Sequence, residues 1–109
     1  MVILVTAIIK LQSNKYHAFE CKGHSGFAEA GSDIVCSAIS MLTINTANSI
    51  LELTDTDIEP RDNDGYICWD FKNGIDDKAE LLMDSMVLGL KTIRDTYSNK
   101  YLTLIIEEV

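Results

Sequence analysis

The sequence predicts an α/β fold, a two-layer sandwich in which two helices cover one mostly antiparallel five-stranded sheet. Three observations predict it. Several short segments rich in Val and Ile alternate apolar residues as strands do, and two long segments place them at the 3–4 spacing of helices. Turn signals between neighbouring strand segments favour antiparallel hairpins. The expected order is strand, strand, helix, strand, strand, helix, strand, in a single domain over residues 1–109.

The first two strands are expected at residues 2–11 and 16–22, separated by the turn signal of residues 13–15. Two-residue alternation places five apolar side chains on one face of the first strand: Ile3, Val5, Ala7, Ile9 and Leu11. The opposite face is also largely apolar up to Lys10. A strand that is apolar on both faces lies inside a covered sheet or in a subunit contact, and in so small a chain we favour a homodimer.

Residues 23–33 hold three of the six glycines and are expected to form a mobile loop. Ser32 or Asp33 is expected to be the N-cap of a long helix that ends near Leu53. The apolar residues of this helix that we expect to face the sheet are Val35, Ile39, Leu42, Ile50 and Leu53.

The acidic segment 55–64, which contains the only proline, is expected to form a short edge strand and turn. Asp64-Gly65 is a hairpin signal, and residues 66–71 alternate as a half-buried strand does. Asp77, three residues before Glu80, resembles a capping box that opens a second helix reaching about Asn99. Its expected apolar stripe is Ala79, Leu82, Met86, Leu90, Ile93 and Tyr97.

Two further features concern the second helix and the end of the chain. Gly89 lies inside the helix, where glycine costs ~1 kcal/mol relative to alanine, so close packing is expected at that point. Residues 101–107 are expected to form the final strand, with Leu102, Leu104 and Ile106 on one face.

The charge and the cysteine content limit the class of function. The formal net charge is -8, with 9 Lys and Arg against 17 Asp and Glu. This balance argues against binding to nucleic acid or to an anionic membrane, and it suits a basic protein partner. Three cysteines without a CxxC motif predict no disulfide framework. The N-terminal segment fits neither a signal peptide nor a membrane helix, so we expect a cytoplasmic protein with reduced thiols.

The segment from Gly23 to Ser40 carries the residues best suited to catalysis. His24 is expected at the exit of a strand, and Cys36 near the first turn of a helix, where the dipole and free N–H groups favour a thiolate. A thiolate beside a histidine is a competent nucleophile. Ser40 lies four positions after Cys36, on the same face of the helix, and could donate to the pair or to an oxyanion.

Each of these residues also has a purely structural interpretation. A cysteine near a helix start is more often a small buried residue, a loop histidine is commonly solvated, and Asp33 is most simply a helix cap. The glycines Gly23, Gly26 and Gly31 could serve only turns that need positive φ. Taken one at a time, these residues do not establish an enzyme.

A metal site and a phosphate site are the alternatives to the cysteine–histidine pair. His17, Cys21, His24 and Cys36 superficially offer zinc ligands, but His17 and Cys21 are four strand residues, or ~13 Å, apart. The glycine loop before a helix lacks a Walker lysine and a dinucleotide fingerprint. No metal and no cofactor are therefore expected.

The segment resembles a known signature. Gly23-His24-Ser25-Gly26, followed by Gly31-x-Asp33-Ile34-Val35-Cys36-Ser37-Ala38-Ile39-Ser40, is similar to the motif of the bacterial ribosomal-processing cysteine proteases, the Prp family. The resemblance extends over essentially the whole chain, including its length, its order of elements and the late Gly89-Leu90. It implies a two-layer α/β fold, a homodimer and a glycine-rich loop that an incoming peptide rearranges.

The resemblance also implies an activity and roles for single residues. The family cleaves an N-terminal extension from large-subunit ribosomal protein number twenty-seven. By resemblance, Cys36 is the nucleophile, His24 is the base and then the acid, and Gly23, Asp33 and Ser40 are supporting residues. The alternative is a non-enzymatic acidic adaptor that binds a basic ribosomal or ribosome-assembly protein, which has no need of the Cys36–His24 pair.

Overall fold

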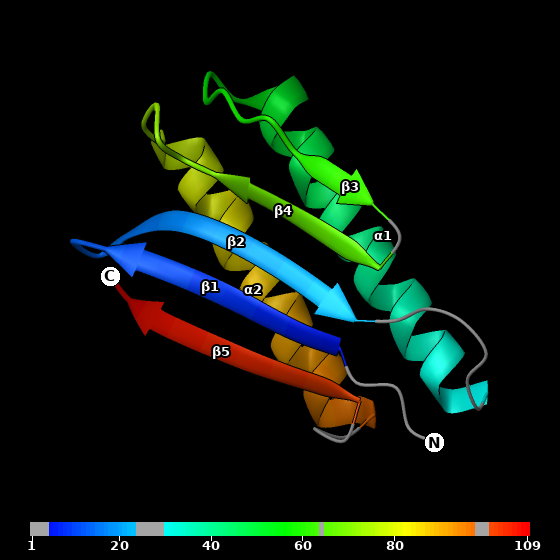
Figure 1. Ribbon diagram of the computed structural model, residues 1–109. Helices are drawn as coiled ribbons and strands as arrows, with labels where there is room; N and C mark the ends of the chain where they lie inside the picture. The colour runs from blue at the N-terminus through cyan, green and yellow to red at the C-terminus, as the bar shows by residue number, and fades with distance from the viewer. Residues whose placement is uncertain (1–4, 24–29, 64, 98–100) are drawn as a thin grey trace.

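The fold consists of a five-stranded sheet covered on one face by two long helices (Figure 1). The computed structural model describes residues 5–23, 30–63, 65–97 and 101–109, with the backbone alone at 30–33. The elements are β1 (Val5–Gln12), β2 (Lys15–Gly23), α1 (Ala30–Leu53), β3 (Arg61–Asn63), β4 (Tyr66–Asp70), α2 (Asp77–Tyr97) and β5 (Leu102–Glu108). The predicted two-layer α/β class and the order of its elements are confirmed.

The sheet is mixed, with the strand order β3-β4-β2-β1-β5. Three neighbouring pairs are antiparallel, as expected, but β1 and β5 are parallel. Helix α2 connects β4 to β5, which lies at the opposite edge of the sheet. Because this helical crossover brings the chain back to the end of the sheet at which β4 begins, β5 runs parallel to β4 and to β1. The sheet is therefore mostly, but not wholly, antiparallel.

The β1–β2 hairpin turns through Ser13 and Asn14, whose φ angles are 53° and 64°. Positive φ at both central residues is the geometry of a type I′ turn, whose twist matches that of the paired strands. A bulge follows, since Lys10 pairs with Ala18 whereas Leu11 pairs with Tyr16. The extra residue, His17, accepts a 2.9 Å hydrogen bond through its carbonyl from the Phe71 amide.

The core lies between the helices and the inner face of the sheet. Alternate strand residues supply one side of it: Val5, Ala7, Ile9, Phe19, Cys21, Ile67, Trp69 and Leu102 are all buried. The rings of Phe19 and Trp69 pack at 4.8 Å. Burial of this apolar surface is the main term that stabilises the sandwich.

Two helix residues do not face the core as predicted. Leu53 is 65% exposed at the end of α1, and Tyr97 is also exposed at the end of α2. Each of them is the last residue of its helix. Met83 and Val87, which the predicted stripe omitted, are buried on α2 instead.

Helix α1 begins earlier than predicted, whereas α2 begins at Asp77 as expected. Helix α1 begins at Ala30, so Gly31, Ser32 and Asp33 lie in its first turn rather than in a loop or at the N-cap. Serine and aspartate are tolerated there as well as at a cap, because the positive end of the helix dipole favours acidic groups. Their presence alone therefore does not locate the cap.

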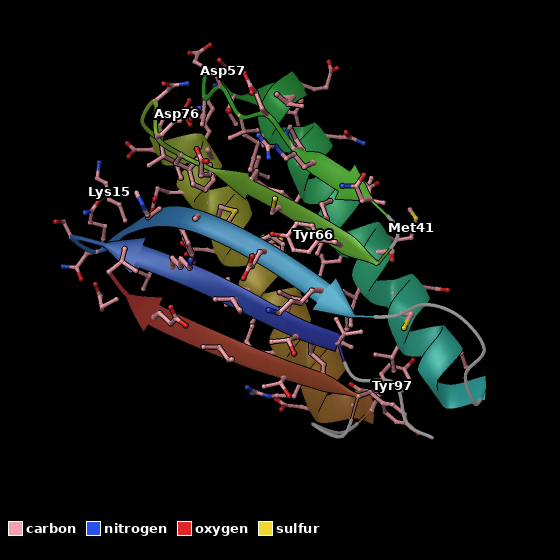
Figure 2. The ribbon with its side chains drawn as sticks, in the orientation of Figure 1. Lys15, Met41, Asp57, Tyr66, Asp76 and Tyr97 are labelled. Atoms are coloured by element: carbon pink, nitrogen blue, oxygen red, sulfur yellow. The ribbon has the colours of Figure 1, made fainter. Side chains whose placement is uncertain are left out.

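The N-cap of α2 is Asp76 rather than Asp77. Its Oδ1 accepts a 2.8 Å hydrogen bond from the Ala79 amide, and its Oδ2 accepts one of 2.9 Å from the Asp55 amide. Figure 2 shows Asp76 beside the start of α2, at the end of the molecule where α1 finishes. The hydrogen bond with Ala79 lowers the pKa of the Asp76 carboxyl most, and the one with Asp55 contributes less. This carboxylate thus joins the segment that follows α1 to the start of α2.

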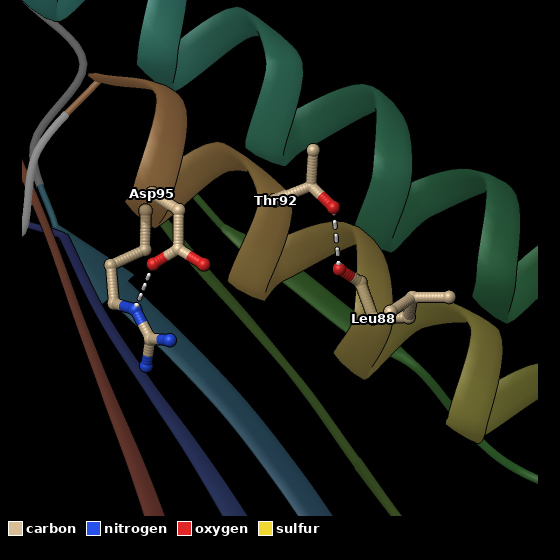
Figure 3. Close-up of polar contacts among 4 residues, drawn as sticks. Leu88, Thr92 and Asp95 are labelled. Carbon is tan, nitrogen blue, oxygen red and sulfur yellow. Dashed lines mark hydrogen bonds and ion pairs between the residues drawn. The ribbon is translucent and has the colours of Figure 1, made fainter.

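Two polar contacts near the end of α2 are local. Figure 3 shows the Thr92 hydroxyl donating to the Leu88 carbonyl at 3.0 Å and Arg94 pairing with its neighbour Asp95 at 3.1 Å. An exposed ion pair of this kind contributes little to stability. On its inner side α2 packs against α1, where Gly89 approaches Leu42, as the internal glycine predicted.

Residues Ile34–Leu53 of α1 are long and apolar enough to cross a membrane by length and composition alone. The same segment supplies Val35, Ile39 and Ile50 to the core. Its apolar character is therefore accounted for by packing within the domain.

Candidate active site

Cys36 lies on the face of α1 that packs on the sheet, and it is 9% exposed. It shares this face with Ile39 and Thr43, at the spacing of three and four residues that brings side chains together on a helix. Cys36 is the seventh residue of α1, so it belongs to the second turn, not the first. The effect of the helix dipole falls off within the first turn, so activation of this thiol depends mainly on groups near its side chain.

A cavity of about 80 Å³ opens beside Cys36, between α1 and the ends of β2 and β4. Helix α1 lines it with Cys36, Ser40 and Thr43, and β2 lines it with Cys21 and Gly23. The remaining walls consist of four apolar residues, Val5, Ile39, Ile44 and Ile67, together with Asp62, Gly65 and Tyr66. The cavity can therefore take a small apolar group next to the thiol.

Ser40 is exposed and lines the cavity one turn after Cys36, as the spacing predicted. Thr43, by contrast, is only 1% exposed, and its hydroxyl donates to the Ile39 carbonyl at 2.9 Å. That hydrogen bond satisfies the Thr43 hydroxyl within the helix. Of these two hydroxyls, the one on Ser40 is the better placed to meet a ligand in the cavity.

Cys21 is the neighbour of Cys36 that the sequence did not indicate. It is 6% exposed on β2, and burial raises the pKa of its thiol to about 12, with a smaller contribution from the negative charge of Cys36. The available signal was the alternation of β2, which places Cys21 on the same inner face as Phe19 and Gly23.

Gly23 is the last residue of β2, and its amide donates to the Gly65 carbonyl at 2.9 Å. The hydrogen bond fixes the point at which the chain leaves the sheet beside the cavity. His24 and Gly26 lie outside the described residues. The backbone of Gly31 and Asp33 lies in the first turn of α1, at its N-terminal end, one turn before Cys36.

The zinc alternative has no support in the described part of the chain, where no three histidine, cysteine or acidic side chains gather as metal ligands do. Cys36 and Cys21 line the cavity together, whereas Cys68 lies on β4 between the inward-facing residues Ile67 and Trp69. The cysteines thus divide into an inner pair and one residue on the outer face of the sheet.

A buried thiol at a cavity, on a helix that follows a strand–glycine exit, is an arrangement that suits a cysteine protease. The family described as Cysteine protease Prp matches residues 4–102, and the chain belongs to it. It is therefore a cysteine-type peptidase of the ribosomal-processing family.

Curated relatives agree with this assignment. The ribosomal processing cysteine protease Prp of Bacillus subtilis (strain 168) is 30% identical over 88 residues, which cover 75% of this chain and 79% of that protein. The protein of the same description from Staphylococcus aureus (strain Mu50) is 33% identical over 78 residues, covering 70% and 74%.

Solved structures share the fold. SMU.848 from Streptococcus mutans superposes with a TM-score of 0.84 at 28% identity, over 97% of this chain and 96% of that one. The S. aureus protease Prp in complex with a substrate peptide gives a TM-score of 0.86 at 25% identity, over 94% and 99%. That S. aureus protease was also solved with a covalently linked product peptide.

Proposed function

We propose that this chain removes the N-terminal extension of large-subunit ribosomal protein number twenty-seven, with Cys36 as nucleophile and His24 as general base and acid. The observation that carries the proposal is the position of Cys36 at an open cavity beside Gly23, the residue immediately before His24. The substrate and covalent product complexes of the S. aureus relative support a peptide as the substrate.

In the proposed reaction, His24 takes the thiol proton and the Cys36 sulfur attacks the scissile carbonyl carbon. When the resulting intermediate collapses, the scissile C–N bond breaks and His24 gives the proton to the leaving amine. Water then releases the acyl group from Cys36. Cys36 needs this local base because it lies beyond the first turn of α1.

The same position of Cys36 bears on the oxyanion. Free N–H groups of a helix belong to its first four residues, and in α1 these precede Cys36. We therefore assign the Ser40 hydroxyl, one turn after Cys36 and exposed to the cavity, as a donor toward the oxyanion or the bound peptide. Gly23 and Asp33 are proposed as supporting residues. The glycines Gly26 and Gly31 would ease rearrangement of the segment around His24 when the peptide binds.

The net charge of -8 suits recognition of a basic ribosomal protein.

The proposed compartment is the cytoplasm, and the proposed assembly is a homodimer. A homodimer would cover apolar side chains on the helix-free face of the sheet, where Ile8 and Ile105 are half-buried in the single chain. Membership of a protease family favours the peptidase over the non-enzymatic adaptor.

The test incubates the purified chain with the extended ribosomal protein and detects the released peptide by mass spectrometry. Cys36→Ala is expected to abolish cleavage, whereas Cys68→Ala, on the other face of the sheet, is expected to retain it. Ser40→Ala is expected to lower kcat by about 10²-fold or more if it stabilises the oxyanion. Equal cleavage by the Cys36→Ala variant, or none by the unmodified chain, would refute the proposed function.

A further inference from the structure

We propose that Cys21 and Cys36 form a reversible disulfide when the protein meets a peroxide, and that this bond switches the enzyme off. The proposed bond rests on the position of the two thiols at one cavity. Its effect on activity rests on the proposed function of Cys36.

The two cysteines line one cavity from the two layers of the fold. Cys21 projects from the inner face of β2 and Cys36 from the inner face of α1, and both line the same cavity of about 80 Å³. The negative charge of Cys36 also contributes, after burial, to the raised pKa of the Cys21 thiol. An open cavity at this point leaves the two side chains room to rotate toward one another.

Cys68 is excluded as the partner by the register of the sheet. Cys21 pairs with Ile67 and Glu20 pairs with Cys68, so Cys68 follows the alternation of the outer face. A disulfide between Cys68 and Cys36 would have to pass through the sheet. The structure therefore offers Cys36 one cysteine partner among the described residues.

The two thiols have different reactivities, which sets the order of the steps. Burial keeps the Cys21 thiol protonated, with its pKa raised to about 12, so peroxide reacts first with Cys36, the nucleophile of the proposed reaction. The Cys36 thiolate attacks one peroxide oxygen: an S–O bond forms, the O–O bond breaks and hydroxide leaves. Cys36 becomes a sulfenic acid, oxidised by two electrons, and the peroxide is reduced.

The second step uses Cys21. Its sulfur attacks the Cys36 sulfur, an S–S bond forms, and the S–O bond breaks as the sulfenic hydroxyl leaves with the Cys21 proton as water. Once Cys36 is an uncharged sulfenic acid, the smaller cause of the raised Cys21 pKa, the charge of Cys36, is gone, while the larger cause, burial, remains. In total, two thiols and one hydrogen peroxide give one disulfide and two waters.

The disulfide would protect Cys36 from further oxidation as well as inhibit the enzyme. A sulfenic acid left without a thiol partner is oxidised further to sulfinic acid, which ordinary thiols do not reduce. A disulfide at the same site returns to two thiols when a dithiol reduces it. Cys21 therefore determines whether oxidation of Cys36 is reversible.

The test exploits the distribution of lysine and arginine. Trypsin separates the three cysteines, since Cys21 falls in residues 16–22, Cys36 in residues 23–61 and Cys68 in residues 62–72. The full chain is treated with hydrogen peroxide, its remaining thiols are alkylated in denaturant, and it is digested without reductant. A cross-link between peptides 16–22 and 23–61 that dithiothreitol removes is the expected result.

Activity after oxidation is the second readout, with Cys21→Ala compared to Cys68→Ala. Dithiothreitol is expected to restore most of the starting activity of the Cys68→Ala variant and less than a tenth of that of Cys21→Ala, whose Cys36 should carry sulfinic acid. No cross-link in the unmodified chain, a cross-link to peptide 62–72 instead, or equal recovery of both variants would overturn the proposal. The cross-link is measured without a substrate, so a failed peptidase assay does not affect it.

Discussion

The contact between Gly89 of α2 and Leu42 of α1 gives a quantitative prediction about the helix layer. An alanine Cβ at position 89 would lie 2.8 Å from Leu42 Cδ2 and 3.2 Å from Cδ1. The first distance is shorter than normal van der Waals contact, so the Leu42 side chain must move to admit a methyl group. Leu42 is half-buried between the two helices, which limits its freedom to move.

Two opposing terms set the effect of Gly89→Ala on the free energy of unfolding. Alanine is favoured over glycine by ~1 kcal/mol inside a helix. Overpacking of a filled contact costs about 1–3 kcal/mol. Taking about 2 kcal/mol for the clash, we expect Gly89→Ala to destabilise the protein by about 1 kcal/mol.

Removing Leu42 should reverse that sign. In a Leu42→Ala background the atoms that clash are absent, so Gly89→Ala should add ~1 kcal/mol through helix propensity alone. The two substitutions should therefore couple by about 2 kcal/mol. Urea unfolding measures these free energies, and Trp69, the only tryptophan and a buried one, provides the fluorescence signal.

Gly74 provides the control for this cycle. Its φ is +100°, and the position that an alanine Cβ would take there has no atom within 4 Å, so Gly74→Ala strains the backbone without touching Leu42. Its cost should be the same with and without Leu42→Ala. If Gly89→Ala stabilised both backgrounds equally, the inference of a tight contact would be wrong.

Two further predictions concern hydrogen bonds of charged groups. The pKa of Asp76 is lowered in the fold, chiefly by the Ala79 amide, so its stabilisation is present above the usual carboxyl pKa of 3.8 and is lost as the pH falls through its folded value. Asp76→Asn should therefore unfold at a lower Tm at pH 7, and its Tm should fall less between pH 4 and pH 2; an unchanged pH profile would contradict this. The Tyr16 hydroxyl donates to Asp84 Oδ1 at 2.5 Å, so Tyr16→Phe should cost about 1 kcal/mol in urea unfolding, whereas the exposed Tyr97→Phe should cost almost nothing. Burial and Asp84 raise the Tyr16 pKa, so the wild-type stability should also decline more steeply above pH 10 than that of Tyr16→Phe.

The sequence predicted the layers well because the alternation of the strands survives in the fold. Val5, Ala7 and Ile9 share the inner face of β1 as expected, and Phe19 and Trp69 meet across the neighbouring strands. The parallel pairing of β5 with β1 could not be read in the same way. Alternation determines which face a residue occupies, but it carries no information on which strand lies beside it.

The helix starts show a second limit of sequence reasoning. Asp76 and Asp77 both suit an N-cap, and only the hydrogen bond to the Ala79 amide distinguishes them. At α1 the same ambiguity among Ser32 and Asp33 shifted the expected start, and with it the position of Cys36 in the helix. A shift of one turn changes the chemistry, because it removes Cys36 from the free amides of the helix end.

The site itself lay partly within reach of the sequence. The spacing of Cys36 and Ser40 placed both at one cavity, since four residues span about one helical turn. The position of Cys21 at the same cavity could not be predicted, because Cys21 is 15 residues from Cys36 in the sequence. Only the packing of α1 over β2 brings the two to one cavity. Cys36 thus has two requirements that usually conflict, a place in the core stripe of α1 and access to a ligand. The cavity satisfies both requirements, because it gives the buried Cys36 access to a ligand. The packing of α1 on the sheet, which forms the wall of the cavity, also brings the Cys21 thiol to it.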